Sequence, residues 1–573
     1  MISRKLKSLF IILTICLLVV GVAAWKFAVT SRAEAPHMER YLPATTLAFV
    51  QVHDLREQTL HIAESDAWKE FSKSNPSASG LFLIAANHTG LLDASYAIAI
   101  TGVNVSKGKP EPNFALIAEF SSNDTRRAFE SRVLSLTPQQ KNSANEPKGE
   151  DYGNVHIRLL GSSTGDSAAY AQTGNLLILA NSVDTVKSII DAHDGKIKTL
   201  GDNPQLAQAR SHIGYNDGMF GFVDGVGMTN LIDTVPVNGK GQDMVSIFRE
   251  LFHASGADST QSVAMTSAFA DGRVVERFTI VTKDGGQGAL RSILNNPGTK
   301  QDLLNLVPDS ANAVADVSIA NAQQTFEELT AMADRLATEH GQHTTGDLFK
   351  EVFDQTGIDV RNDFIQSLGS EACIVDLSDD GKHAGAVILN LADQEKFNHV
   401  IELLAQKAKK TITSQDYQGV QIKTTALENE GGVFYAFVNG NYVASGKLAA
   451  VQQIIDTAKS GKSLSTSVAY RTAAAPLSGS PQFVFYGTNH HYLHEMTEMI
   501  PGQNKDLKDA TQGETNLAPS FAFGIAKPDG LYVESYSPLG TFPHLLTLVT
   551  AKIGMDQSTH PEVLKAETRN STK

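Results

Sequence analysis

A long-range internal repeat constrains the fold of this chain more than any other feature of its sequence. The repeat emerges when the chain is compared with itself at a shift of about 265 residues. The segment 151–157, Asp-Tyr-Gly-Asn-Val-His-Ile, corresponds to 416–422, and the segment 186–191, Val-Lys-Ser-Ile-Ile-Asp, corresponds to 451–456. Three shorter matches keep the same order: Leu42-Pro43 with Val307-Pro308, Pro236 with Pro501, and Asp271-Gly272 with Asp529-Gly530. Because the matches are collinear, the sequence predicts two copies of one unit.

Each copy contains an apolar helical face followed by a glycine. The faces consist of Val183, Val186, Ile189 and Ile190 in the first copy and of Leu448, Val451, Ile454 and Ile455 in the second. Gly195 and Gly461 follow these faces, where a residue with positive φ commonly ends a helix. Short strands joined by Asp-Gly and Asn-Gly turns flank the helices. This mixture of hairpins and short helices is typical of an α+β fold with antiparallel sheets.

We therefore expect an α+β protein in which an N-terminal single transmembrane helix is followed by two tandem copies of an antiparallel-sheet-plus-helices unit. The expected boundaries follow from the repeat and from composition: a signal anchor over residues 1–30, a linker over 31–40, unit 1 over 41–285, a connection over 286–305, unit 2 over 306–545 and a C-terminal tail over 546–573.

The N-terminal segment predicts export and attachment to the cytoplasmic membrane. Three cationic residues, Arg4, Lys5 and Lys7, precede an apolar run over 9–29 that only Lys26 interrupts. This run has about the length that spans a bilayer, and the basic start predicts a single pass with the body on the periplasmic or extracellular side. A cleaved signal peptide is the alternative, with small residues available before position 25 or 36. Lipidation at Cys16 is disfavoured because the bulky Ile15 precedes it.

Composition excludes one large class of partners. The formal net charge of the 573 residues is −14. Because the phosphate backbone of a nucleic acid is also negative and repels such a protein, no nucleic-acid partner is expected. Hydrophobic residues make up 42% of the chain, enough for ordinary packed cores. Cys16 lies in the apolar N-terminal segment, so it can hardly meet Cys373, and the two cysteines predict no disulfide framework.

The second copy contains Gly357-Ile358-Asp359 and then Leu368-Gly369-Ser370-Glu371. With these segments it resembles a bacterial membrane-anchored envelope family of unknown function, a domain of unknown function with a Gly-Ile-Asp segment followed by Leu-Gly-x-Glu. Ser370 stands where that family has a second glycine. The resemblance implies an exported protein and carries no activity and no catalytic residues.

A histidine cluster is the main candidate site. His490 and His494 are spaced i and i+4, so a helix would place both on one face with Glu498, as metal ligation requires. The segment is not the zincin motif, because Glu498 stands where that motif has its second histidine. The repeat has no counterpart of these histidines in the first copy. An exposed polar helix start explains the same residues.

Two motif-like segments have simpler interpretations. The residues 161–165 fit G-x-S-x-G but join two expected strands rather than a strand and a helix, as a nucleophile elbow requires. Gly461-Lys462-Ser463 follows a helix, whereas a phosphate-binding loop precedes one. Asp191, Asp456, Tyr152 and Tyr417 recur in both copies, so we interpret them as structural.

The sequence predicts no catalytic residue and no cofactor, and it favours a non-catalytic protein without excluding an enzyme. Three function classes remain open. The first is an uncharacterised membrane-anchored extracytoplasmic protein with a binding or envelope-assembly role, whose partners are the membrane through residues 9–29 and an envelope protein. The second is a carrier or sensor of an apolar ligand held in a cavity of the repeat units. The third is a hydrolase of unrecognised type.

Overall fold

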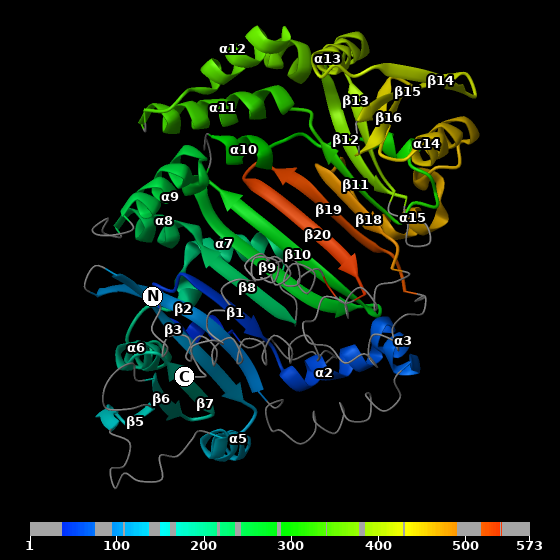
Figure 1. Ribbon diagram of the computed structural model, residues 1–573. Helices are drawn as coiled ribbons and strands as arrows, with labels where there is room; N and C mark the ends of the chain where they lie inside the picture. The colour runs from blue at the N-terminus through cyan, green and yellow to red at the C-terminus, as the bar shows by residue number, and fades with distance from the viewer. Residues whose placement is uncertain are drawn as a thin grey trace, which may run out of the picture.

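The computed structural model describes residues 37–74, 94–106, 109–136, 149–160, 168–214, 218–234, 242–283, 288–339, 341–377, 384–427, 430–489, 517–538 and 540. Its central feature is one antiparallel sheet of 20 strands, with helices on both faces and beyond one edge (Figure 1).

The N-terminal half of the sheet contains ten strands. They are β1 (Ala48–Val52), β2 (Ala94–Ser106), β3 (Lys109–Phe120), β4 (Gly149–Tyr152), β5 (Val155–Leu160), β6 (Ala168–Thr173), β7 (Leu176–Ala180), β8 (Met219–Asp224), β9 (Thr260–Ala270) and β10 (Arg273–Thr282). Their pairings give the order β4-β5-β6-β7-β3-β2-β1-β8-β9-β10.

The C-terminal half contains the other ten strands in a matching order. They are β11 (Ala313–Ser318), β12 (Leu368–Asp376), β13 (Gly385–Leu391), β14 (Ile412–Tyr417), β15 (Val420–Leu427), β16 (Glu430–Val438), β17 (Asn441–Ser445), β18 (Phe483–Gly487), β19 (Ser520–Lys527) and β20 (Gly530–Ser537). The order is β14-β15-β16-β17-β13-β12-β11-β18-β19-β20.

The helices of the N-terminal half and the connection are α2 (Leu55–Glu64), α3 (Asp66–Ser74), α5 (Asn123–Leu136), α6 (Val183–His193), α7 (Pro204–Ile213), α8 (Gly225–Thr234), α9 (Gln242–Ala254) and α10 (Ala289–Leu294). Those of the C-terminal half are α11 (Ala322–Glu339), α12 (Thr345–Thr356), α13 (Gln394–Lys407), α14 (Leu448–Ser460) and α15 (Val468–Ala473). Short helical turns complete the fold: η1 (Met38–Tyr41), η2 (Leu200–Asp202), η3 (Ala257–Ser259), η4 (Asp302–Asn305), η5 (Val360–Phe364), η6 (Ile365–Ser367) and η7 (Leu464–Thr466).

Two hydrophobic clusters form the core on one face of the sheet. Val186, Ile189 and Ile190 of α6 are buried in the N-terminal cluster, and Ile454 and Ile455 of α14 are buried in the C-terminal one. Burying such a side chain stabilises the fold by roughly 1.5–3 kcal/mol. The same i, i+3, i+4 spacing that predicted these helices therefore places their apolar faces against the sheet.

The two halves meet where β10 pairs with β20. The ladder runs antiparallel from Val274 opposite Ser537 to Val281 opposite Gly530. At its centre Arg277 Nε lies 3.1 Å from Glu534 Oε1. The hydroxyls of Tyr532 and Tyr536 donate to the same carboxylate at 2.8 and 2.9 Å. The backbone pairing of β10 with β20 and this polar cluster therefore join the two halves into one continuous sheet.

The predicted fold class is therefore wrong. The chain was expected to place two tandem sheet-plus-helices units behind a transmembrane helix, whereas the described strands form one sheet that runs through both halves. The physical reason is that β10 and β20 satisfy each other's backbone groups, so neither half ends in a free edge at that point. No helix in the described part of the chain is both long enough and apolar enough to cross a membrane. The predicted membrane segment, residues 9–29, lies outside the described residues.

Candidate functional site

The histidine cluster predicted from the sequence cannot be located in the structure. His490, His494 and Glu498 lie outside the described residues, and so does the loop 161–165. Within the described residues, no group of three or more His, Cys, Asp or Glu side chains is arranged to hold a metal ion.

The repeated tyrosines and aspartates hold a hairpin to a helix in each half. The Tyr152 hydroxyl donates to Asp191 Oδ2 at 2.8 Å, which ties the β4–β5 hairpin to α6. The Tyr417 hydroxyl donates to Asp456 Oδ2 at 3.1 Å and ties β14–β15 to α14 in the same way. Gly461, with φ of +71°, ends α14, so Gly461-Lys462-Ser463 is a helix C-terminus. These residues have structural roles in the fold.

The residues that carry the family resemblance cap helices and position strands. Asp359 accepts hydrogen bonds from the backbone N–H groups of Arg361 and Asn362, at 3.0 Å each, and so begins η5. These backbone bonds lower the pKa of Asp359. At Gly369 the absence of a side chain matters, because a Cβ there would lie 2.0 Å from Asn390 Oδ1. Gly369 therefore allows the Asn390 amide to approach and bind the next backbone N–H.

Glu371, the last residue of that motif, belongs to a buried carboxyl pair. It accepts hydrogen bonds from the backbone N–H groups of Asp302 and Leu303 at 3.1 and 3.3 Å, at the start of η4. Its partner is Asp316 on the neighbouring strand, which is 1% exposed. No N–H or hydroxyl group within the described ranges donates to either oxygen of Asp316. The pair is thus enclosed, with donors on the Glu371 side only.

Such a pair cannot hold two negative charges in an apolar interior. Burial is the largest cause that raises the pKa of Asp316, to about 9, and the nearby Glu371 carboxylate adds to it. Burial also raises the pKa of Glu371, against the two backbone donors that favour its charged form. Burial and the neighbouring Glu371 therefore favour the protonated form of Asp316. The Cys373 thiol beside them is buried, free and raised in pKa by burial.

Sequence reasoning missed Asp316, although a signal was present. Strand β11 reads Ala-Val-Ala-Asp-Val-Ser, and its alternation places Val314, Asp316 and Ser318 on the same face. That face is the core face, because Val314 belongs to the hydrophobic cluster. An acidic residue at a core position of an alternating strand indicates a paired or protonated carboxyl group.

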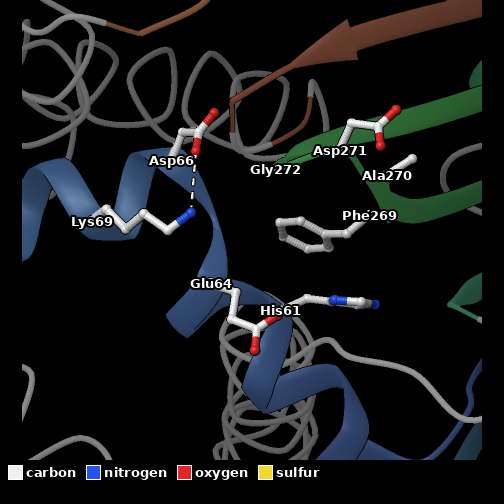
Figure 2. Close-up of a pocket in the computed structure, with 8 residues that line it drawn as sticks. All are labelled: His61, Glu64, Asp66, Lys69, Phe269, Ala270, Asp271 and Gly272. Carbon is white, nitrogen blue, oxygen red and sulfur yellow. Dashed lines mark hydrogen bonds and ion pairs between the residues drawn. The ribbon is translucent and has the colours of Figure 1, made fainter.

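An open cavity of about 330 Å³ lies between the α2–α3 helices and the turn of the β9–β10 hairpin (Figure 2). It is lined by His61, Glu64, Asp66, Lys69, Phe269, Ala270, Asp271 and Gly272. The rings of His61 and Phe269 lie nearly parallel at 5.9 Å between centroids, and burial lowers the pKa of His61 to about 4. Asp66 holds the wall together, because its N–H donates to Gly272 O at 3.2 Å and its carboxylate pairs with Lys69 at 3.4 Å. Four of its eight lining residues, Glu64, Asp66, Lys69 and Asp271, are charged.

The helices α11 and α12 form a different kind of surface, beyond the edge of the sheet (Figure 1). Phe326 of α11 stacks on Phe349 of α12 at 5.5 Å between centroids. Around this stack four other large apolar side chains are exposed, Leu329 by 41%, Leu348 by 51%, Val352 by 37% and Phe353 by 53%, whereas Met332 and Leu336 of α11 are partly buried. These six residues, Phe326, Leu329, Leu348, Phe349, Val352 and Phe353, are called the α11–α12 apolar surface below.

This surface is unusual because the apolar side chains of both helices are at most partly buried. No residue of α12 is buried, and none of residues 322–338 in α11 is buried. Local signals nevertheless define α12 sharply. Thr344 and Asp347 form a capping box at its start, and Gly357 with φ of +78° ends it. The helix is therefore well specified, and beyond the stack of Phe349 on Phe326 its large apolar side chains remain exposed in the described structure.

A second, smaller apolar strip lies on the sheet. Ile374 of β12 is 63% exposed and stands beside Val387 of β13, which is 40% exposed. Both point away from the core face that carries Cys373 and Ile388.

Comparisons with known proteins match part of the chain to one family model and give no function. Residues 285–560 match the model of a family described as "Protein of unknown function (DUF3352)". For that segment, the match confirms the predicted likeness to a domain family of unknown function. No curated protein matches the chain. A solved structure described as "Structure of crystal form III of TP0453" is similar over 48% of this chain and 91% of that chain, at 8% identity and a TM-score of 0.23. At that TM-score the likeness carries no argument about fold or function.

Proposed function

We propose that this protein is a non-catalytic binding or assembly protein of the bacterial envelope, and that the α11–α12 apolar surface is where it binds a partner. The observation that carries this proposal is the exposure of a whole amphipathic helix. In α14, the same kind of apolar face is buried against the sheet, whereas α12 buries none of its residues. Exposed contiguous apolar surfaces on soluble domains usually mark interaction sites.

The envelope location rests on the N-terminal segment and on the family resemblance. The basic start at Arg4, Lys5 and Lys7 and the apolar run over 9–29 favour export and contact with the cytoplasmic membrane. The Gly357-Ile358-Asp359 and Leu368-Gly369-Ser370-Glu371 segments agree with a membrane-anchored envelope family. In this proposal the body lies on the periplasmic or extracellular side, where it can reach an envelope protein.

The two other function classes have weaker support. An apolar ligand prefers an apolar enclosure, but the cavity of Figure 2 is open and half of its lining residues are charged, among them Glu64, Asp66 and Asp271. A hydrolase needs carboxyl groups that substrate can reach, but Asp316 and Glu371 are 1% and 4% exposed.

The proposal is tested by comparing what the chain captures from envelope membranes. The wild-type chain, a Leu348→Ser/Phe353→Ser variant and an Ile374→Ser control are expressed at equal levels, crosslinked and purified. Ile374 is a matched control because it is apolar and even more exposed, yet lies outside the α11–α12 apolar surface. We expect at least one envelope protein to be lost from the α12 variant and retained by the control. Identical captured proteins from all three chains would refute a binding role for this surface.

A further inference from the structure

The charge around the α11–α12 apolar surface narrows the class of its partner. The two helices carry seven acidic and two basic residues. The acidic residues are Glu327, Glu328, Asp334, Glu339, Asp347, Glu351 and Asp354, and the basic residues are Arg335 and Lys350. Lys350 is already paired with Asp354. The rim of the surface is therefore negative.

The positions of these charges match the geometry of helix pairing. Glu327 lies one position after Phe326 on α11, and Glu351 lies one position before Val352 on α12. Successive residues lie about 100° apart around a helix, so Glu327 and Glu351, which are both exposed, lie to the side of Phe326 and Val352 rather than over them. An apolar seam with charged flanks is the arrangement by which one helix recognises another.

We propose that the α11–α12 apolar surface binds an amphipathic helix of a partner protein, with an apolar face and Lys or Arg residues on its flanks. This inference rests on the proposed binding function and adds the chemistry of the partner. The incoming helix packs its apolar face on Leu329, Leu348 and Phe353 and becomes the third helix of a small bundle. Its basic flanks face Glu327 and Glu351 and set its orientation.

The charge also separates this partner from two other occupants. A membrane with anionic headgroups is repelled by a surface rimmed with carboxylates. A second copy of this chain would place two negative rims against each other, and like charges across an interface disfavour association. A basic helix is the occupant for which both the apolar face and the rim are favourable.

The test uses the full chain in nanodiscs of zwitterionic lipid and two fluorescent synthetic peptides of about five helical turns. Both peptides carry leucines at i, i+3, i+4 and i+7. One has lysines on its flanks, and its twin has glutamates there. Fluorescence anisotropy measures binding. We expect the basic peptide to bind at least about tenfold more tightly than the acidic twin, and to weaken by a similar factor between about 0.1 and 0.5 M salt.

Variants of the chain separate the apolar and charged parts of the proposal. Leu348→Ser/Phe353→Ser should abolish peptide binding, whereas Ile374→Ser should leave it unchanged. Glu327→Lys/Glu351→Lys should reverse the preference, so that the acidic twin binds more tightly. Unchanged melting temperatures show that all variants are folded, as expected for surface substitutions.

Several outcomes would overturn the inference. Equal binding of both peptides would remove the role of charge. Binding of the chain to vesicles of anionic lipid through this surface, or a dimer in sedimentation velocity that Phe353→Ser dissolves, would replace the proposed partner with a membrane or a second copy. If neither peptide binds but the α12 variant still loses an envelope protein, the proposed function stands and the basic-helix inference fails. If neither effect is seen, both fail.

Discussion

The buried carboxyl pair makes the folding stability of this protein depend on pH in an unusual direction. Replacing Asp316 by Asn is the perturbation that reveals it. Asn has nearly the same shape as a protonated Asp and is likewise neutral, but it cannot release a proton. The side chain is 1% exposed, so solvent does not reach it in the folded state.

The sign follows from the direction of the pKa shift. Burial raises the folded-state pKa of Asp316 to about 9, whereas an unfolded Asp titrates near 4, about its reference value. A raised folded pKa means that the stability contributed by this group is fully present below the unfolded pKa. It is lost as pH rises from about 4 towards 9, because only the unfolded chain releases the proton in that range.

The magnitude follows from the number of protons. One proton held by the folded state and released by the unfolded state changes the free energy of unfolding by about 1.4 kcal/mol per pH unit. Between pH 6 and pH 8 the contribution of Asp316 is therefore a loss of up to roughly 3 kcal/mol. Of the other titratable groups near the pair, Asp302 raises the pKa of Asp316 through its charge, whereas burial raises the pKa of Cys373 and of Tyr470 and keeps both neutral in this range.

The assay is urea unfolding of the wild-type chain and the Asp316→Asn variant at pH 6, 7 and 8. We expect the free energy of unfolding of the variant, relative to the wild type, to rise by about 1 kcal/mol for each pH unit. Asp309→Asn is the control, because Asp309 is exposed on the turn before β11 and should leave the pH dependence unchanged. Parallel curves for Asp316→Asn and the wild type would show that Asp316 is ionised in the folded protein and would refute the reasoning.

Three further predictions concern stability. Gly369→Ala should lower the free energy of unfolding by about 1–3 kcal/mol in urea titrations, because its Cβ would lie 2.0 Å from Asn390 Oδ1; an unchanged midpoint would contradict this close approach. Ile454→Ala should lower it by about 2–5 kcal/mol by the same measurement, since the side chain is 0% exposed in the core; a loss below about 1 kcal/mol would contradict that packing. Asp359→Ala should cost about 1 kcal/mol by removing the cap of η5, whereas Asp359→Asn should retain most of it; equal losses from both would argue against capping.

Local structure could be predicted from the sequence wherever one periodicity or one turn residue decided it. The apolar spacing of Val186, Ile189 and Ile190 predicted a helix packed on the core, and α6 is that helix. The turn at Asp271-Gly272 has positive φ at both residues, as its composition required. These features depend on neighbours in the sequence, so the sequence alone contains their cause.

The sheet could not be predicted in the same way, because strand pairing depends on which edges meet. Nothing in the alternation of 273–282 or 530–537 specifies that β10 pairs with β20 rather than with another chain or with solvent. The partnership of Asp316 with Glu371 was hidden for a related reason, since the two residues are neighbours only after β11 and β12 pair. Both features depend on pairing between strands that are distant in the sequence, and local propensity does not determine that pairing.

The contrast between α12 and α14 shows why a binding surface is also hidden from sequence reasoning. Both helices have an apolar face at helical spacing and both end at a glycine with positive φ. The face of α14 meets the sheet and buries Val451, Ile454 and Ile455, whereas α12 lies against α11, α13 and η5 without burying any residue. An amphipathic pattern predicts that a helix has an apolar face that must be buried. It does not indicate whether that face packs against the same chain or against a partner. The structure supplies that distinction, because α12 is fully specified by its caps and still leaves Leu348 and Phe353 exposed. The exposed apolar face of α12 is therefore available to bind a partner, and the peptide experiment measures whether a basic or an acidic amphipathic helix binds it more tightly.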